Sequence, residues 1–322
     1  MAGLVAAARA RELGAGVQLL EKGDRPGGSM LLSSCVIWRY TDFAEYRRQC
    51  PNGDETLQRL VWERLDDALI WLERLGAPLV APQTENPLTT GRRFDPQGLT
   101  DALVRAAGSV ELGRAAPGTD RPLVIATGGY PVRFAHDRGL LVRSNRWSEG
   151  DGIALALAGG AVEEPSDEFY GRAMPGSVPE EAFVAASQLY GRFARRVNDL
   201  GEEFFPGEVS WSENDLAQAI ARQPGGRAWY ELDEAALARP EVAARLAYAQ
   251  ETEPLHPAGL RVRVYAAVTH TYGGVKIDAR ARAADGIWAA GVDAGGFSNG
   301  GYASGLAQAL VLGLVAAEDA CQ

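Results

Sequence analysis

Cysteine, basic residues and long apolar runs are all scarce in this sequence of 322 residues. The three cysteines, Cys35, Cys50 and Cys321, are isolated and lack metal-ligand spacing, which argues against a disulfide framework or a zinc site. Such isolated thiols suit a reducing compartment. Lysine and arginine number 32 against 42 aspartates and glutamates, giving a formal net charge of -10. The chain therefore lacks the basic face that a nucleic-acid-binding protein needs.

No apolar stretch is long enough to predict a membrane span. A span needs about 20 consecutive apolar residues, and the nearest candidate, 306–317, is shorter and is interrupted by Gln308 and Gly313. The N-terminus shows no basic region followed by an apolar core, so we expect no secretory signal. These absences favour a cytoplasmic protein of enzyme size.

What the sequence does contain is 38 glycines, which gather in short clusters. The first cluster opens a stretch typical of the second half of a dinucleotide-binding βαβ unit. A small-residue helix begins at Ala2 and Gly3, turns at Gly14, and leads into an apolar strand that ends at Glu21. A helix N-terminus favours a pyrophosphate, and an acid about 18 residues after the glycine is placed to bind a ribose. The alternative for Glu21 is an exposed acid that merely ends a strand.

Further glycine loops follow predicted strands. The segment 27–34 combines bare backbone with serine hydroxyls, so that a phosphate or a flavin ring could approach, although an ordinary polar turn fits equally well. The apolar run 122–126 ends at Thr127 and Gly128, as a buried parallel strand does where it meets a ligand. Near the C-terminus a strand ends at Gly291, and a glycine-rich loop then leads into a helix over 303–319. The amides that begin this helix can stabilise negative charge on a cofactor.

The composition changes between about residues 165 and 265, where prolines, aromatics and charges increase and glycine clusters become rare. Helical spacing is evident at 56–75 and 96–107. The order is therefore a nucleotide-binding domain, an insertion, and a return to the first domain. We expect an α/β fold in which a Rossmann-like domain is split by an inserted α+β domain.

These segments together resemble the flavoprotein family of succinate dehydrogenase and fumarate reductase, which includes 3-ketosteroid dehydrogenases, urocanate reductase and tricarballylate dehydrogenase. The resemblance is carried by the segments 20–28, 126–129, 150–152, 270–274 and 288–305. It implies an FAD-binding domain over 1–160 and 269–322 and a capping, substrate-binding domain over 161–268. It also implies hydride transfer between flavin N5 and a small organic substrate across a C–C bond, with an unidentified electron donor or acceptor.

The resemblance further implies which residues hold FAD, and no metal is among the ligands. The expected cofactor-binding residues are Ala2, Gly3, Glu21, Lys22, Gly27, Gly28, Ser29, Ser33, Ser34, Ala126, Thr127, Gly128, Asp151, Gly273, Gly291, Asp293, Ser304, Gly305 and Leu306.

The sequence also departs from the family pattern. Family members normally open with a strand and a full glycine fingerprint, whereas this chain begins at the last glycine, as an N-terminally truncated member would. A β-hairpin of the family is expected to be missing, since only residues 111–121 span that interval. The proton-donating arginine of the dicarboxylate enzymes has no counterpart in 209–212, and Gly300, Gly301 and Tyr302 replace the arginine that clamps their substrate. A neutral or differently charged substrate is therefore expected.

Three residues are the predicted catalytic groups. His270 precedes a Thr-Tyr-Gly-Gly turn and could hydrogen-bond or polarise the substrate, with a hinge histidine as the alternative. Tyr302 could donate a proton or a hydrogen bond to a carbonyl, and packing is an equally good reading. Arg172 could bind a carboxylate through two hydrogen bonds, although many such arginines are solvated surface charges.

Two rival functions follow from the same features. The first is a fumarate- or tricarballylate-type carboxylate oxidoreductase in which Arg172 or another arginine of the insertion replaces the missing ones. The second is a truncated, non-catalytic remnant that folds without flavin, because a missing central strand would remove both buried contacts and pyrophosphate ligands.

Overall fold

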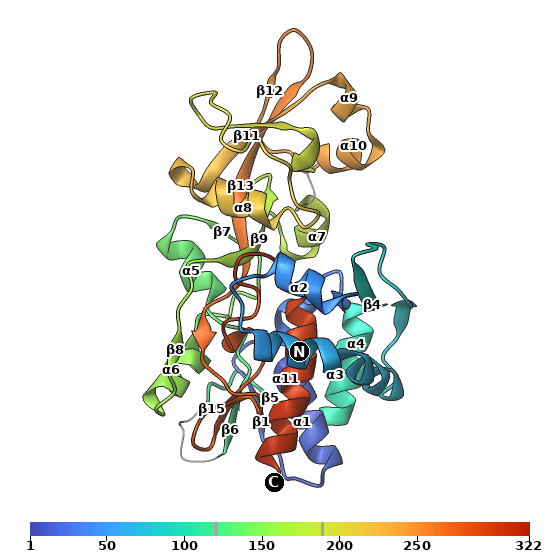
Figure 1. Cartoon of the computed structure of the whole chain (residues 1–322), viewed down its shortest axis with the longest axis vertical. Coiled ribbons are helices and arrows are strands. Elements are labelled where there is room, and N and C mark those ends of the chain that lie inside the picture. The colour runs from blue at the N-terminus through green and yellow to red at the C-terminus, as the bar shows by residue number, and fades with distance from the viewer. Residues whose placement is uncertain (117, 119–121, 188–189) are drawn as a thin grey trace. The chain divides into compact units, whose positions relative to one another are not determined.

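The computed structural model describes residues 1–116, 118, 122–187 and 190–322 (Figure 1). These residues form two compact units. Unit 1 comprises Met1–Tyr130, Asn145–Glu168 and Thr271–Gln322, and unit 2 comprises Pro131–Ser144 and Phe169–His270. The prediction of a missing hairpin at 111–121 falls partly on residues 117 and 119–121, which lie outside the described residues.

Parallel strands form the centre of unit 1. Strand β1 (Leu19–Glu21) pairs in parallel with β5 (Val110–Leu112), and β6 (Leu123–Ile125) pairs in parallel with β16 (Ile287–Ala289). Strand β15 (Arg282–Ala284) continues the second sheet in antiparallel fashion. Because β6 and β16 run in the same direction, the segments that follow them leave the sheet side by side.

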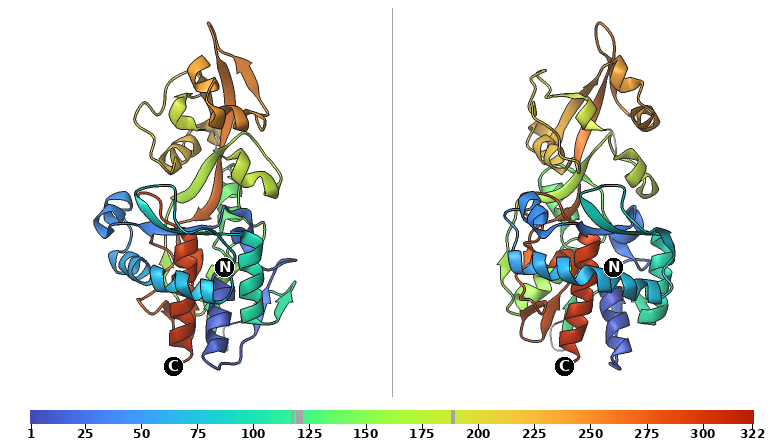
Figure 2. Two further views of the ribbon diagram at one scale, coloured as in Figure 1. Left: turned by 90° about the vertical axis from the view of Figure 1, so that its right-hand side faces the viewer. Right: turned by 45° about the vertical axis from the view of Figure 1, so that its right-hand side comes forward.

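Helices cover these strands. Helix α1 (Ala2–Glu12) packs against both α11 (Gly305–Ala320) and α4 (Pro96–Ala107), and α11 also contacts α3 (Glu55–Arg74). The views of Figures 1 and 2 show α1 and α11 side by side. Almost every residue of α11 from Ala307 onward is buried, so this apolar helix belongs to the core.

The rest of unit 1 surrounds this centre. A three-stranded antiparallel sheet has the order β2 (Val36–Tyr40), β4 (Thr89–Phe94) and β3 (Leu79–Ala81). The remaining elements are η1 (Gly28–Leu32), α2 (Phe43–Gln49), α6 (Asp151–Ala158), β8 (Glu163–Glu164), β14 (Gly274–Val275) and η5 (Gly291–Asp293).

Unit 2 is built around one long strand, β13 (Leu260–Thr271). Strands β11 (Arg227–Leu232) and β12 (Thr252–Pro254) pair with it antiparallel, and β7 (Leu141–Val142) pairs with it in parallel. Strand β9 (Phe169–Met174) also pairs with β13, and β10 (Arg195–Val197) pairs with β11. The helices are α5 (Pro131–Asp137), η2 (Glu180–Ala182), α7 (Phe183–Ala186), η3 (Gly191–Phe193), α8 (Asn214–Ala221), η4 (Pro224–Gly226), α9 (Glu234–Leu237) and α10 (Pro240–Leu246).

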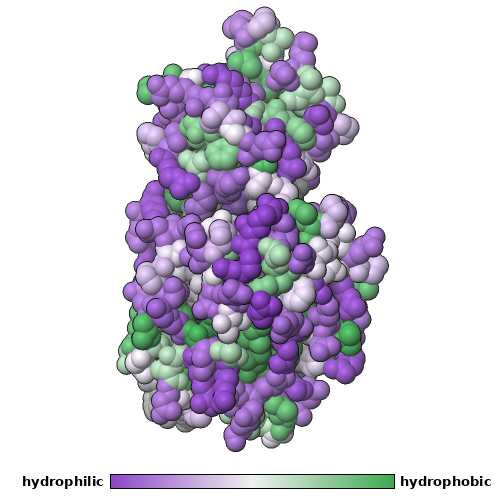
Figure 3. Space-filling model, viewed as in Figure 1, coloured by the Kyte–Doolittle hydropathy of each residue, from purple (hydrophilic) through white to green (hydrophobic). Residues whose placement is uncertain are grey.

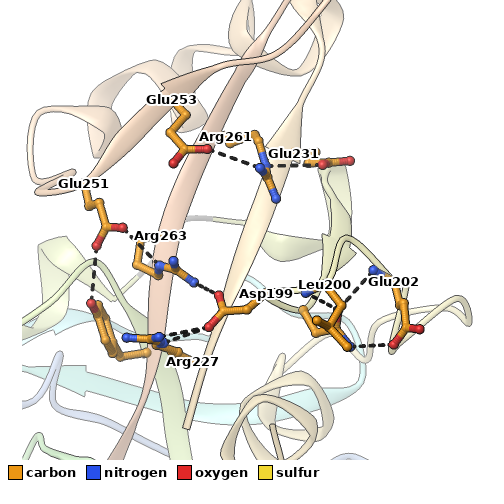
Figure 4. Close-up of polar contacts among 11 residues, drawn as sticks. Asp199, Leu200, Glu202, Arg227, Glu231, Glu251, Glu253, Arg261 and Arg263 are labelled. Carbon is orange, nitrogen blue, oxygen red and sulfur yellow. Dashed lines mark hydrogen bonds and ion pairs between the residues drawn. The ribbon is translucent and has the colours of Figure 1, made fainter. Parts of the chain in front are cut away.

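An ion-pair network crosses the sheet of unit 2 (Figure 4). Arg263 and Arg227 both pair with Asp199, and Arg263 also pairs with Glu251. The guanidinium of Arg263 lies 3.8 Å from the ring centre of the buried Trp229 on the neighbouring strand. A nearly buried arginine needs such partners, because an unpaired charge in this position would be costly. The network thus ties the 198–203 turn to β13 within unit 2.

Hydrophilic residues cover most of the face drawn in Figure 3. Among the described residues, no helix has both the length and the apolar character to cross a membrane. The described part of the chain also shows no group of three or more histidine, cysteine or acidic side chains that could hold a metal ion.

Candidate functional site

The start of α1 lies at the carboxyl ends of two parallel strands. A Cβ atom placed on Gly3 would lie 3.4 Å from the Cβ of Ala126, which directly follows β6. A Cβ atom on Gly291, which follows β16, would lie 3.1 Å from the Cβ of Ala2. No side chain of the described residues caps α1. Four predicted residues are thus together around free helix amides, whose positive dipole end favours an anion such as a pyrophosphate.

Glu21 ends β1, and only one of its two carboxylate oxygens accepts a hydrogen bond from the described residues. One oxygen, Oε1, accepts a hydrogen bond of 2.7 Å from the amide of Gly23. The other oxygen, Oε2, accepts none from the residues that the structure describes. A half-buried carboxylate with a free oxygen at a strand end can bind ribose hydroxyls.

Trp147 lies beside the same strand end, and sequence reasoning missed it. A Cβ atom on Gly23 would be 2.7 Å from Trp147 Cδ1, so the indole packs directly on this glycine. The indole Nε1 is buried and has no hydrogen-bond partner among the described residues. A buried donor of this kind indicates a partner outside the protein. A polar ligand next to Glu21 would supply one.

Lys22 and Asp151 are also brought together, but they point at each other. The Lys22 Nζ atom lies 2.5 Å from Asp151 Oδ2 and 2.5 Å from Glu149 Oε2. The hydrogen bonds to Asp151 and Glu149 raise the pKa of Lys22 above its ordinary value. The ammonium group is therefore engaged within the protein, and it anchors the first residue of α6 to the end of β1.

The segment 27–34 contributes backbone more than hydroxyls. Gly27 and Gly28 have φ angles of 107° and 55°, in the left-handed region that favours glycine. Ser29 accepts a hydrogen bond from the Asn145 amide, and Ser33 donates to the Met30 carbonyl. Ser34 is exposed. The first two hydroxyls thus shape the loop itself.

Asp293 is fully buried, and its carboxylate points into the loop that follows β6. It accepts hydrogen bonds from Thr127 Oγ1 and the Gly128 amide, both at 2.8 Å, and from the Gly129 amide at 3.3 Å. Burial raises the pKa of Asp293, while the Thr127 hydroxyl and the loop amides oppose that rise. The structure therefore brings Asp293, Thr127 and Gly128 together as a contact within the protein.

The loop before α11 is held from several sides. Ser304 caps α11 by accepting the Ala307 amide at 3.3 Å, while Gly305 and Leu306 form the partly exposed start of the helix. Gln308, which the sequence reading did not select, donates from Nε2 to the carbonyls of Gly291 at 2.9 Å and Ala294 at 2.8 Å. Gly273 lies elsewhere in unit 1, where a Cβ atom would be 2.5 Å from the Tyr130 hydroxyl. A close approach inside the protein is what requires glycine at 273.

Tyr302 is fixed by its backbone and its ring. Its carbonyl accepts the Tyr40 hydroxyl at 2.6 Å, and the preceding carbonyl, of Gly301, accepts the Tyr272 hydroxyl at 2.6 Å. The Tyr302 ring meets Trp38 edge to face, with 5.4 Å between ring centres. The residue as a whole is half-buried.

His270 and Arg172 belong to unit 2, where Tyr170 lies between them. The His270 ring is 5.3 Å from the Tyr170 ring, and Arg172 Nε donates to the Tyr170 hydroxyl at 3.2 Å. Arg143 donates to the hydroxyl of Thr269, the residue before His270, at 2.9 Å. Burial, together with the positive charge of Arg143, lowers the pKa of His270 to about 4. At neutral pH His270 is therefore an uncharged hydrogen-bonding group.

Unit 1 has the features of an α/β dinucleotide-binding protein: parallel strands, a helix that begins at the carboxyl ends of two of them, and an acid that ends a further parallel strand. The family model described as FAD binding domain matches residues 95–305. The chain belongs to this family, which confirms the predicted cofactor, FAD. Comparison with curated protein sequences gave no match.

Solved structures share the fold over the whole chain. One is the open conformation of a flavocytochrome c3 fumarate reductase, with 21% identity, a TM-score of 0.72, and coverage of 99% of this chain and 76% of that one. Another is 3-ketosteroid-Δ4-(5α)-dehydrogenase from Rhodococcus jostii RHA1, with 17% identity, a TM-score of 0.74, and coverage of 100% and 95%. The 3-ketosteroid Δ1-dehydrogenase from Sterolibacterium denitrificans gives 15% identity, a TM-score of 0.71, and coverage of 99% and 97%. These likenesses confirm the predicted α/β fold class.

The residues of unit 1 fit the adenosine and pyrophosphate portion of FAD. The free amides of α1 suit the pyrophosphate, the unused Glu21 oxygen suits the ribose, and the buried Trp147 Nε1 lacks a partner at the same place. Gly27 and Gly28 leave the neighbouring backbone bare.

Proposed function

We propose that this chain is an FAD-dependent oxidoreductase in which unit 1 holds the cofactor. The observations that carry the proposal are the uncapped start of α1 at the carboxyl ends of β6 and β16, and the half-free carboxylate of Glu21 at the end of β1. The solved structures that share the fold are named as a fumarate reductase and as ketosteroid dehydrogenases, which supports two-electron chemistry on an organic substrate. The electron donor or acceptor is unidentified, and the isolated free cysteines suit a cytoplasmic enzyme.

Bound FAD supplies hydride transfer across a C–C bond of the substrate. In unit 1, Tyr302 is the proposed hydrogen-bond or proton donor to a substrate carbonyl, because this half-buried residue has a fixed backbone and a phenol that can act as a weak acid. In unit 2, His270 is proposed as an uncharged hydrogen-bonding group. Arg172 donates a hydrogen bond to the Tyr170 hydroxyl, and the Tyr170 ring lies against His270, so the three side chains form one cluster.

The state of His270 favours an uncharged substrate group over a carboxylate. An imidazole whose pKa is about 4 carries no positive charge at neutral pH, so it offers a hydrogen bond and no ion pair. We propose a neutral carbonyl compound as the substrate, and Arg172 in the same cluster is the group that would bind a carboxylate in the alternative. Fumarate and 4-androstene-3,17-dione are the probes that separate a dicarboxylate from a neutral carbonyl substrate.

Replacing Glu21 by alanine tests the placement of the adenosine portion. Losing hydrogen bonds to a charged carboxylate should raise the dissociation constant for FAD by about tenfold to a hundredfold. The measurement is a titration of apo-protein followed by quenching of flavin fluorescence. FMN is the matched control ligand, because it has no adenosine for Glu21 to bind. Equal losses for FAD and FMN, or no loss for FAD, would contradict the placement.

A further inference from the structure

We infer that Asp293 is a positioning residue for the cofactor: its carboxylate locks together the two loops that flank the start of α1. The inference rests on the proposed function, since it concerns how this chain prepares its FAD site. In this role the Asp293 carboxylate does not contact FAD itself; it holds the backbone of the neighbouring loop in place.

The Asp293 carboxylate accepts hydrogen bonds from the loop that follows β6. Successive amides of Gly128 and Gly129 point at it, and Thr127 adds a hydroxyl. Both glycines are left-handed, with φ angles of 91° and 69°. Successive amides in such a turn form an anion-binding concavity. Here the anion is the protein's own carboxylate, so this loop is closed to a phosphate.

The two loops that Asp293 joins, which follow β6 and β16, both lie at the start of α1. Ala126 touches Gly3, and Gly291 touches Ala2, so both loops lie against the first turn of α1. Asp293 joins them two residues beyond Gly291. Gln308 then ties the Gly291 and Ala294 carbonyls to α11. The walls on either side of the free α1 amides are thus fixed to one another and to the core.

The loop that binds the Asp293 carboxylate is closely packed by neighbouring segments. A Cβ atom on Gly128 would lie 2.6 Å from Ser148 Oγ, and one on Gly152 would lie 2.5 Å from Thr127 Oγ1. Ser148 and Gly152 therefore pack closely on this loop, and Gly152 approaches the same Thr127 Oγ1 atom that donates to Asp293. Loss of the hydrogen bonds to the carboxylate would change the position of the loop that lies against the start of α1.

The test compares Asp293→Asn with Asp319→Asn. Asp319 is a matched control because it is another nearly buried carboxylate of unit 1, bonded to Arg282 and to Trp288 Nε1. It lies about 16 Å along α11 from Gln308, since a helix rises about 1.5 Å per residue. FAD affinity would be measured by quenching of flavin fluorescence, and the loop by hydrogen exchange of the Gly128 and Gly129 amides in the apo-protein.

Asp293→Asn should raise the dissociation constant for FAD by about tenfold or more and speed exchange at Gly128 and Gly129. Asp319→Asn should lower the melting temperature and leave affinity within about twofold of wild type. Thr127→Val removes one donor and keeps the carboxylate, so a smaller loss in the same direction tests the inference even if Asp293→Asn does not fold. Unchanged affinity in Asp293→Asn or in Thr127→Val, or an equal loss in Asp319→Asn, would overturn it.

The outcome also separates this inference from the proposed function. A wild-type chain that takes up no FAD overturns the function, and the positioning role falls with it. If the wild-type chain binds FAD and the Asp293→Asn variant binds it with the same dissociation constant, the positioning role alone is overturned.

Discussion

Replacing Gly313 by valine should destabilise the protein by about 3 kcal/mol, among the larger effects of overpacking a core. Gly313 lies inside α11, where the helix packs against Ala2 and Val5 of α1. A Cβ atom there would meet the Ala2 carbonyl oxygen at 2.8 Å and the Val5 Cγ1 and Cβ atoms at 2.9 and 3.0 Å. Backbone of a packed helix cannot yield as a flexible side chain can, so α1 must move.

Thermal unfolding followed by circular dichroism checks this expectation. A loss of about 3 kcal/mol lowers the melting temperature by roughly 4 °C in a chain of 322 residues, because the unfolding entropy is about 2.1 cal/mol/K per residue. Gly16→Val is the control, because Gly16 is exposed, has no positive φ, and has nothing within 4 Å of its ideal Cβ. A Gly313→Val protein that melts with wild type would show that α1 and α11 are not in the described contact.

Removing the Tyr302 hydroxyl should lower kcat by about a hundredfold while FAD affinity stays at the wild-type level. Tyr302→Phe keeps the ring on Trp38 and the backbone contact to Tyr40, so only the phenolic donor is lost. General acid catalysis by one positioned group typically contributes about a hundredfold or more. The check is steady-state kinetics on 4-androstene-3,17-dione, the carbonyl probe. The dissociation constant for FAD is measured in parallel.

Tyr40→Phe separates chemistry from loop position. It removes the hydrogen bond to the Tyr302 carbonyl and leaves the Tyr302 hydroxyl in place. We expect it to cost much less than Tyr302→Phe. Equal losses in the two variants would mean that Tyr302 acts through the loop, and wild-type kcat in Tyr302→Phe would remove it from the reaction.

Local signals in the sequence predicted three of the longer helices of unit 1 to within two residues at either end. The range 96–107 matches α4, because Pro96 favours the first turn and Gly108 follows the last one. The range 56–75 differs from α3 by one residue at each end. The last helix begins at Gly305 and not at 303, because the Ser304 hydroxyl caps it.

Long-range partners could not be predicted in the same way. The sequence selected Asp293 and Thr127 separately, but nothing in their spacing indicates that one carboxylate binds the other loop. Trp147 was missed because its contact with Gly23 depends on the fold. Gln308 did leave a signal: a polar residue inside an otherwise apolar helix must find hydrogen-bond partners when it is buried.

Titration of the purified apo-protein with FAD tests the central claim most directly. If the start of α1 and Glu21 form an FAD site, the chain should take up one FAD and keep its visible flavin absorbance through gel filtration. A protein that remains colourless after incubation with excess FAD, while its melting curve shows it to be folded, would contradict the account.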